Sequence, residues 1–545
     1  MTEEATSESD LQRKIHDWPP DATLDFIGRL SSLLRFGQPD YRTIGFQRML
    51  VERLKLGTYR VRLLALLHAP RVFVFPEQLA VLIKYVVQNS SGTRWPADFE
   101  DAFTQALLIV SDLRLKRVGA AATTAASFLP VEIAGMFGFE DPYVNKLLIY
   151  ATFFKWTHTD GARSLAAFTN VTDEFEKRFK IHWLDFMSAG YGLLMWYKQI
   201  STLDILSKYS FILSPQALDQ YKDQGNIRRF LELNKIELEN LSKELGQRWA
   251  YSNLGSSLFP LKQRPFVELS GNRLCCPYVQ FLENASTSGL FYRLADSYQA
   301  EDAKKSRSLR AFFGQFLEQY VFSIFERISY KCGYQIHGDK TYRVGKKERH
   351  GADVVFFDGH NVAFIEVTAT RFREIDSLVE LRDEFIEEDV ERLVAKVREL
   401  NEDIRDFRSG SLTYVGVDPA SVARTFPLLV TSFAVPHFVG IISIIREAIE
   451  REKLLENTES LEIAEVQALD LLEHDLVSTI SIFDLLSIKQ KRTAGRPVSL
   501  MNFVALRGRE VGLDPAIPKP QPLLDIENEL RDRFNSWGGP QIVPP

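Results

Sequence analysis

The stretch from Gly351 to Phe372 constrains the fold of this 545-residue chain more than any other part of its sequence. Two β-branched and aromatic runs, ADVVFF and VAFIEVT, are separated by the tetrapeptide DGHN at 358–361. Asp-Gly between two such runs is a strong signal for a tight turn between antiparallel strands. We therefore predict strands at 352–357 and 362–369 that pair across this turn.

The turn also predicts which residues face each other. A hairpin symmetric about DGHN sets Val355 opposite Phe364 and, one step further out, Asp353 opposite Glu366. Opposed residues have Cβ atoms about 4.5–5.5 Å apart on one face of a sheet. The other face is apolar and is expected to pack on helices; it carries Val354, Phe356, Ala363 and Ile365. A slip of one residue would bury both acids in that layer, so the register is well specified.

Two carboxylates held this close repel each other unless a cation lies between them. Their oxygen atoms are the ligands that Mg²⁺ or Mn²⁺ prefers. A third acid, Glu318, lies on a helix expected at 308–330, with Gly314 one turn earlier to let this helix approach the sheet. Helical spacing places Glu318 in an apolar stripe, where a carboxylate is costly unless it is paired. The predicted metal ligands are therefore Asp353, Glu366 and Glu318.

The order of these elements resembles the PD-(D/E)XK, or restriction-endonuclease-like, nuclease superfamily. A helix with Glu318 precedes a strand with Asp353 and a strand with Glu366, and a charged helix follows at about 380–407. The resemblance covers roughly Ser308 to Val435. It implies a restriction-endonuclease-like α/β domain that hydrolyses phosphodiesters with a divalent metal, with Asp353 and Glu366 on the metal and Glu318 as the helix acid.

The sequence departs from that superfamily at one position. The superfamily lysine should stand two residues after Glu366, and this position is Thr368. The lysine is implied to orient the attacking water and to stabilise charge on the phosphate. Its replacement is expected to be Lys396 on the following helix, ahead of Arg371 just beyond the strand. Third in order come the lysines of the preceding loop, Lys340, Lys346 and Lys347.

The segment from Asp339 to His350 holds five cationic residues against two acidic ones. We predict that it is a loop that binds nucleic acid, with DNA favoured over RNA, and that Tyr342 stacks on a base or sugar. The predicted phosphate contacts are Lys340, Arg343, Lys346, Lys347 and Arg349.

The predicted fold class is mixed: a large all-helical N-terminal region is followed by the α/β domain. We expect a disordered tail at 1–20, a helical domain at 21–255 and a β-hairpin with a connecting segment at 256–300. The nuclease-like domain is expected at 301–510 and a loosely ordered Pro-rich tail at 511–545. Within 227–249 the pattern predicts one long amphipathic helix that ends near Gly246.

Composition excludes several classes of protein. A net charge of −6 and a pI of about 6.0 exclude a uniformly basic nucleic-acid coat. Three cysteines cannot form a disulfide framework, so a reducing, cytoplasmic setting is expected. No phosphate-loop, dinucleotide, zinc-protease or hydrolase-elbow motif is found. The uncharged window 426–445 predicts a buried strand and the start of a helix, and no membrane contact is expected.

Thr368 leaves a second function open: an inactive nuclease fold that serves as a nucleic-acid or protein binding module or scaffold. A third reading is a helical interaction protein whose α/β part is structural. A helical region joined to a nuclease-like domain is similar to the layout of many prokaryotic antiviral defence proteins. That layout is compatible with a protein partner bound to the helical region and with a homodimer.

Overall fold

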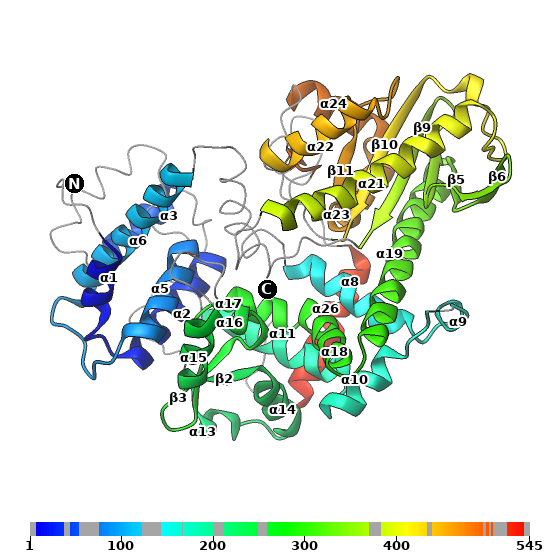
Figure 1. The fold of residues 1–545 in the computed structure, drawn as a ribbon. Helices are drawn as coiled ribbons and strands as arrows, with labels where there is room; N and C mark the ends of the chain where they lie inside the picture. Colours follow the sequence, from blue (N-terminus) through cyan, green and yellow to red (C-terminus); the bar gives the residue numbers. More distant parts are fainter. Residues whose placement is uncertain are drawn as a thin grey trace.

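In the residues that it describes, the computed structural model combines many helices with three sheets (Figure 1). It describes residues 7–36, 44–53, 76–121, 143–165, 167–200, 212–248, 259–369, 383–432, 439–493, 498–500, 503–504 and 520–538. Over this part of the chain, none of the helices has the length and apolar character needed to cross a membrane.

The first part of the chain is mainly helical, as expected. Apolar residues at helical spacing form its core, and in α2 the buried residues include Leu24, Ile27, Leu30 and Leu34. The helices before the long α19 are α1 (Glu8–Ile15), α2 (Pro20–Phe36), α3 (Ile44–Arg53), α5 (Pro76–Asn89), α6 (Phe99–Ala121), α8 (Tyr143–Trp156), α9 (Asp160–Arg163), α10 (Val171–Phe179), α11 (Trp183–Ile200), α13 (Pro215–Leu218), α14 (Gly225–Asn234), α15 (Leu238–Arg248), α16 (Phe259–Gln263), α17 (Val279–Ala285) and α18 (Ser288–Glu301).

This region also contains a four-stranded sheet, so the all-helical prediction for 21–255 is wrong. The expected hairpin is confirmed as β3 (Phe266–Leu269) and β4 (Arg273–Cys275), which pair antiparallel. Two very short strands complete the order β1-β4-β3-β2: β1 (Ile212–Leu213) and β2 (Lys235–Glu237). Because β2 separates α14 from α15, the single long helix predicted within 227–249 is also wrong. Strands of two or three residues have no alternation from which they could be predicted.

Helices form within both terminal segments that were predicted as tails. In place of a disordered tail at 1–20, Ser7 caps α1 together with Asp10, and the side chains of Leu11, Ile15 and Trp18 are buried.

The Pro-rich tail expected at 511–545 contains α26 (Gln521–Ser536), which packs along α11. Here Gly192 makes room for the ring of Phe534, since a Cβ at Gly192 would lie 2.2 Å from that ring. The apolar spacing within α26 outweighs the prolines that precede it, and Leu523, Leu530 and Phe534 are buried.

The C-terminal part forms a five-stranded sheet covered by helices on both faces. The strand order is β11-β10-β9-β8-β5, with β9, β10 and β11 parallel and β8 antiparallel to both of its neighbours. The strands are β5 (Gln335–Gly338), β8 (Val354–Phe357), β9 (Asn361–Thr368), β10 (Arg424–Thr431) and β11 (Glu462–Glu465). One face packs on α19 (Ala303–Cys332), α23 (Val466–Ser478) and α24 (Ile482–Thr493). The other packs on α21 (Asp383–Arg408) and α22 (Val439–Glu452).

The predicted hairpin is confirmed in its turn and its register. Gly359 takes a positive φ of 102°, and the carboxylate of Asp358 accepts hydrogen bonds from the backbone N–H groups of His360 and Asn361. Val355 pairs with Phe364, as the symmetric hairpin requires. The apolar face packs on α19, where the rings of Phe325 and Phe356 lie 5.2 Å apart. The window 426–445 is a strand and the start of a helix, as expected, because β10 contains its first residues and α22 begins at Val439.

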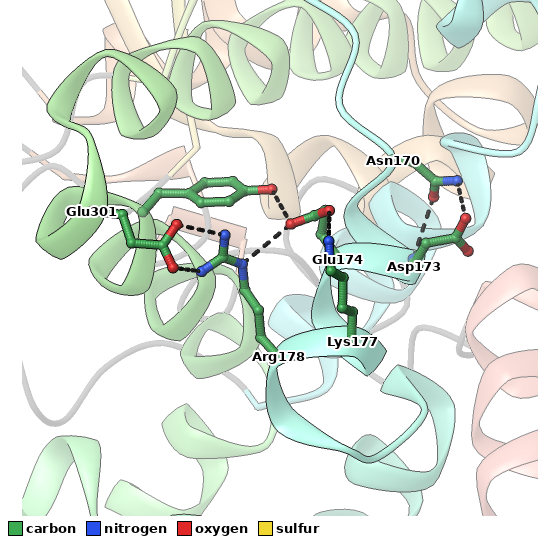
Figure 2. Close-up of polar contacts among 7 residues, drawn as sticks. Asn170, Asp173, Glu174, Lys177, Arg178 and Glu301 are labelled. Atoms are coloured by element: carbon green, nitrogen blue, oxygen red, sulfur yellow. Dashed lines mark hydrogen bonds and ion pairs between the residues drawn. The ribbon is translucent and has the colours of Figure 1, made fainter.

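An ion-pair network joins α10 to α18, the helix that leads into α19 (Figure 2). Arg178 donates to both carboxylate oxygens of Glu301, at 2.6 and 2.9 Å, and to Glu174 at 3.2 Å. Its guanidinium lies 4.5 Å from the ring centroid of Tyr298. A bidentate pair fixes orientation as well as distance, so this network helps to set where α19 begins.

We predict that Asp470 makes the stability of the protein depend on pH. Tyr320 on α19 donates to its Oδ1 at 2.8 Å, and burial raises the pKa of Asp470 to about 7. Because this pKa is raised, burial of the charged form destabilises the fold above pH 7, and the penalty fades as pH falls toward the ordinary carboxyl range. Asp470→Asn should therefore raise the free energy of unfolding by about 1–4 kcal/mol at pH 8, and by much less at pH 5. Urea unfolding of both proteins at the two pH values measures this; an equal gain at both would contradict it.

Candidate functional site

Two acidic side chains meet on the face of the sheet that α21 covers. Asp353 lies directly before β8, and Glu366 lies in β9 with only 4% of its surface exposed. The last paired residues are Val354 and Ile365, so one further step of the same register sets Asp353 opposite Glu366. The carboxylate of Asp353 also accepts a hydrogen bond of 2.7 Å from the backbone N–H of Val367. The predicted neighbourhood of these two acids is thus confirmed.

Lys396 on α21 reaches this pair of acids. The buried stripe of α21 packs on the sheet through Leu393, Val397 and Leu400, which directs the adjacent Lys396 toward the acids. Its Nζ donates to Glu366 Oε2 at 3.2 Å and to Glu399 Oε2 at 2.7 Å. A third of the Lys396 side chain is exposed, so the residue is only partly enclosed by the protein.

The electrostatics of the group follow from burial and close charges. Burial raises the pKa of Glu366, and the charge of Asp353 raises it further, while Lys396 opposes both. Burial also raises the pKa of Asp353. Although burial disfavours a charged ammonium, the carboxylates of Glu366 and Glu399 raise the pKa of Lys396 above its usual range. One lysine thus faces two buried acids, and the negative charge of the pair is only partly compensated.

Glu318 lies at the edge of the group, and its surroundings differ from those predicted. Its side chain is exposed rather than enclosed in an apolar stripe, and only Val321 and Phe325 on that face are buried. A Cβ added at Gly314 would meet no atom within 4 Å, so this glycine does not bring α19 closer to the sheet. Partial burial and the charge of Asp353 still raise the pKa of Glu318 to about 7. Glu318 on α19 is therefore close enough to Asp353 for the two carboxylates to repel each other.

The structure shows which suggested source of the missing cation reaches the acid pair. Thr368 is buried two residues beyond Glu366, at the position where the superfamily has its lysine. Lys396 reaches Glu366 from the next helix. Arg371 lies outside the described residues.

The basic segment is a hairpin rather than the predicted loop. It consists of β6 (Thr341–Val344) and β7 (Lys347–His350), which form a separate two-stranded sheet. Tyr342 is buried, with its hydroxyl 2.9 Å from Asp406 Oδ2 and 3.1 Å from Asp403 Oδ1, so it cannot stack on a nucleotide as predicted.

The five predicted phosphate contacts fall into two groups. Lys340 donates to the carbonyl oxygen of Thr413, and Arg349 pairs with Asp406 at 2.8 Å, so both cations contact protein acceptors. The other three are exposed and lie at or beside the hairpin tip: Lys346, Lys347 and Arg343, of which Arg343 pairs with Glu348 at 3.6 Å.

Sequence reasoning missed Asp339 and its partner His350. One step beyond the pair Gly338–Val354 sets Asp339 opposite Asp353, and His350 Nδ1 lies 3.2 Å from Asp339 Oδ2. The charge of Asp339 adds to the raised pKa values of Asp353 and Glu318. A prediction that β5 pairs with β8 would have placed Asp339 beside Asp353.

The donor set fits a magnesium site built on two carboxylates. Among the described residues, no three His, Cys, Asp or Glu side chains are grouped as a ready-made ligand set, so Glu318 is not placed as a direct ligand. Mg²⁺ commonly takes one or two carboxylates and keeps several waters. Asp353 and Glu366 meet that need, and their uncompensated charge favours a cation.

Comparison with known proteins does not identify a relative: no family model matches the chain, and neither a curated protein nor a solved structure shows significant similarity to it.

Proposed function

We propose that this protein is a metal-dependent nuclease that hydrolyses phosphodiester bonds in DNA or RNA through a restriction-endonuclease-like domain. One observation carries the proposal: Lys396 Nζ lies 3.2 Å from Glu366 on the sheet face that also holds Asp353. Two opposed acids and one lysine are the set that the sequence resemblance implies, although the lysine comes from a different element. The order of Glu318, Asp353, Glu366 and the following helix also agrees with that resemblance.

Asp353 and Glu366 would hold Mg²⁺ or Mn²⁺, and Glu318 would act through a water molecule. A bound metal would lower the pKa of a coordinated water and neutralise charge on the phosphate. Lys396 has two tasks in this arrangement. It favours the charged form of Glu366 and orients its carboxylate, and from a partly exposed side chain it would present its ammonium to the phosphate oxygens, where charge develops during hydrolysis.

The role of Lys396 predicts a rescue that a merely structural ion pair would not show. Lys396→Ala should reduce turnover about 10²–10³-fold with little change in substrate affinity, because the cation acts on charge that develops in the transition state. Thr368→Lys in the same variant should restore part of that loss, since residue 368 shares a sheet face with Glu366. Single-turnover cleavage of labelled DNA and RNA with Mg²⁺ measures both effects.

Arg392→Ala is the matched control, because Arg392 lies one helical turn before Lys396 and pairs with Asp389 rather than with the acid pair. Full activity of Lys396→Ala would rule out its assigned role, and equal losses in the two variants would point to disruption of α21.

The acid pair predicts that metal stabilises the fold. Mg²⁺ or Mn²⁺ should raise the Tm of the parent protein, because a ligand that binds only the folded state stabilises it by mass action. Asp353→Asn keeps an oxygen for the N–H of Val367 but removes the repulsion and one ligand together. This variant should be at least as stable as the parent without metal, and its Tm should not respond to Mg²⁺. Differential scanning calorimetry with Asp358→Asn as control tests this; an undiminished metal response in Asp353→Asn would count against the site.

The hairpin tip is proposed to contact phosphates, with DNA as the first substrate to test. Tyr342 and Arg349 fix β6 and β7 to α21, so the exposed cations keep a set position relative to Lys396. Lys346→Gln together with Lys347→Gln should raise KM several-fold and leave kcat close to the parent value, since these residues bind ground and transition states alike. A fall in kcat at constant KM would contradict this assignment.

Thr368 supports a second candidate function, a nuclease fold without catalysis that binds nucleic acid or protein. Metal-independent binding with no cleavage of any DNA or RNA would favour it. A role in antiviral defence, with the helical region as the docking part for a protein partner, is an extension of the first proposal and rests on the layout of the chain.

A further inference from the structure

The long helix α19 carries a row of cations on a face that stays open to solvent. Lys304, Arg307 and Arg310 follow one another at three-residue spacing, and all three are exposed. Within the described part of the chain, their side chains make no hydrogen bond or ion pair. The acids next to them are already engaged, since Glu301 pairs with Arg178 and Asp302 caps α19. The row is therefore a local excess of positive charge on a protein with a net charge of −6.

This face of α19 leads to the acid group. Arg307, Ala311, Gly314 and Glu318 recur at the spacing of one helix face. Ala311 and Glu318 are exposed, and the space over Gly314 is empty to 4 Å. Two turns beyond, the same face is covered by the sheet, where Phe325 contacts Phe356. The open surface thus ends at Glu318, beside Asp353.

The dimensions suit a strand of nucleic acid. Eleven residues of helix separate Arg307 from Glu318, a rise of about 16 Å. One strand of a duplex advances about 3.4 Å per nucleotide, so this distance covers about five nucleotides. Between the cations and Glu318 this face carries only Ala311 and Gly314. These small residues leave room for a nucleic-acid backbone to pass close to the helix.

We propose that the face of α19 from Lys304 to Glu318 binds the phosphate backbone of the nucleic-acid substrate and directs it to the acid pair. This inference rests on the proposed nuclease function and deepens it. The cations contact the backbone of the strand several nucleotides away from the phosphate that lies beside Glu366. Charge complementarity is the basis of the binding, so affinity should depend steeply on salt and little on base sequence.

Binding measured without cleavage tests the proposal. Fluorescence anisotropy of labelled DNA and RNA strands and duplexes in EDTA gives the dissociation constant as a function of salt. The triple variant Lys304→Gln/Arg307→Gln/Arg310→Gln should bind about tenfold or more weakly at low salt. Its slope of log affinity against log salt should fall by about 2–3, the value for three lost phosphate contacts. Lys305→Gln is the control, because Lys305 is exposed on the opposite side of the same turn and should leave the affinity almost unchanged.

A second variant keeps the cations and obstructs the path. Gly314→Glu adds a negative side chain where a Cβ meets nothing, and it improves the helix propensity of α19, so the protein should fold. It should weaken binding by about the same factor as the triple variant. Parent-like affinity and salt slope in folded Gly314→Glu and triple variants would overturn the proposal, as would binding of an acidic peptide but of no nucleic acid.

The two proposals fail in different ways. If the parent protein cleaves DNA and the α19 variants bind DNA normally, only the proposed binding face of α19 is wrong. If the parent protein never cleaves but the α19 variants lose binding, the binding face is supported and the proposed nuclease activity is wrong.

Discussion

The contact between Lys396 and Glu366 is the interaction on which the candidate site depends. Glu366 is buried in β9, and a buried carboxylate is strongly disfavoured without a partner. Lys396 supplies that partner from α21 at 3.2 Å, while Asp353 adds a second acid from the neighbouring strand. Replacing this group by apolar residues would suit the core at least as well, since buried ion pairs contribute little net stability. A charged group on a central strand of the sheet is therefore better explained by chemistry than by stability, and this supports the metal-binding active site that we propose.

The surrounding fold holds this group in place through long-range contacts. α21 crosses the sheet on its apolar stripe and so presents Lys396 to β9. The β6–β7 hairpin is fixed to the same helix by the buried acids Asp403 and Asp406. On the opposite face, α19 extends from the helical region to the sheet (Figure 1) and brings Glu318 to the site. Because α19 belongs to both regions, the nucleic acid that we propose to bind along its first half would lead to the acid pair beside Glu318.

Local patterns predicted the hairpin and its acids, and non-local packing explains what they missed. The DGHN turn and the alternation on both sides sufficed for the register that sets Asp353 beside Glu366, because a tight turn leaves few alternatives. Glu318 was misjudged because helical spacing shows which residues share a face but not whether the sheet reaches it. The short strands β1 and β2 form only by pairing with β4 and β3, far away in the chain, and Tyr342 is buried only because α21 offers Asp403 and Asp406. Asp339 was not predicted as a site residue because its position depends on the long-range pairing of β5 with β8.

The most direct measurement is a crystal structure of the protein with Mn²⁺, with the ion located from its anomalous scattering. We expect a peak between the carboxylates of Asp353 and Glu366, with Mn–O distances of about 2.2 Å and Lys396 Nζ still within hydrogen-bonding distance of Glu366. Glu318 should lie one water molecule away from the ion. No anomalous peak at these acids under saturating Mn²⁺, or a peak bound elsewhere while Lys396 and Glu366 remain a closed ion pair, would contradict the assignment of this site.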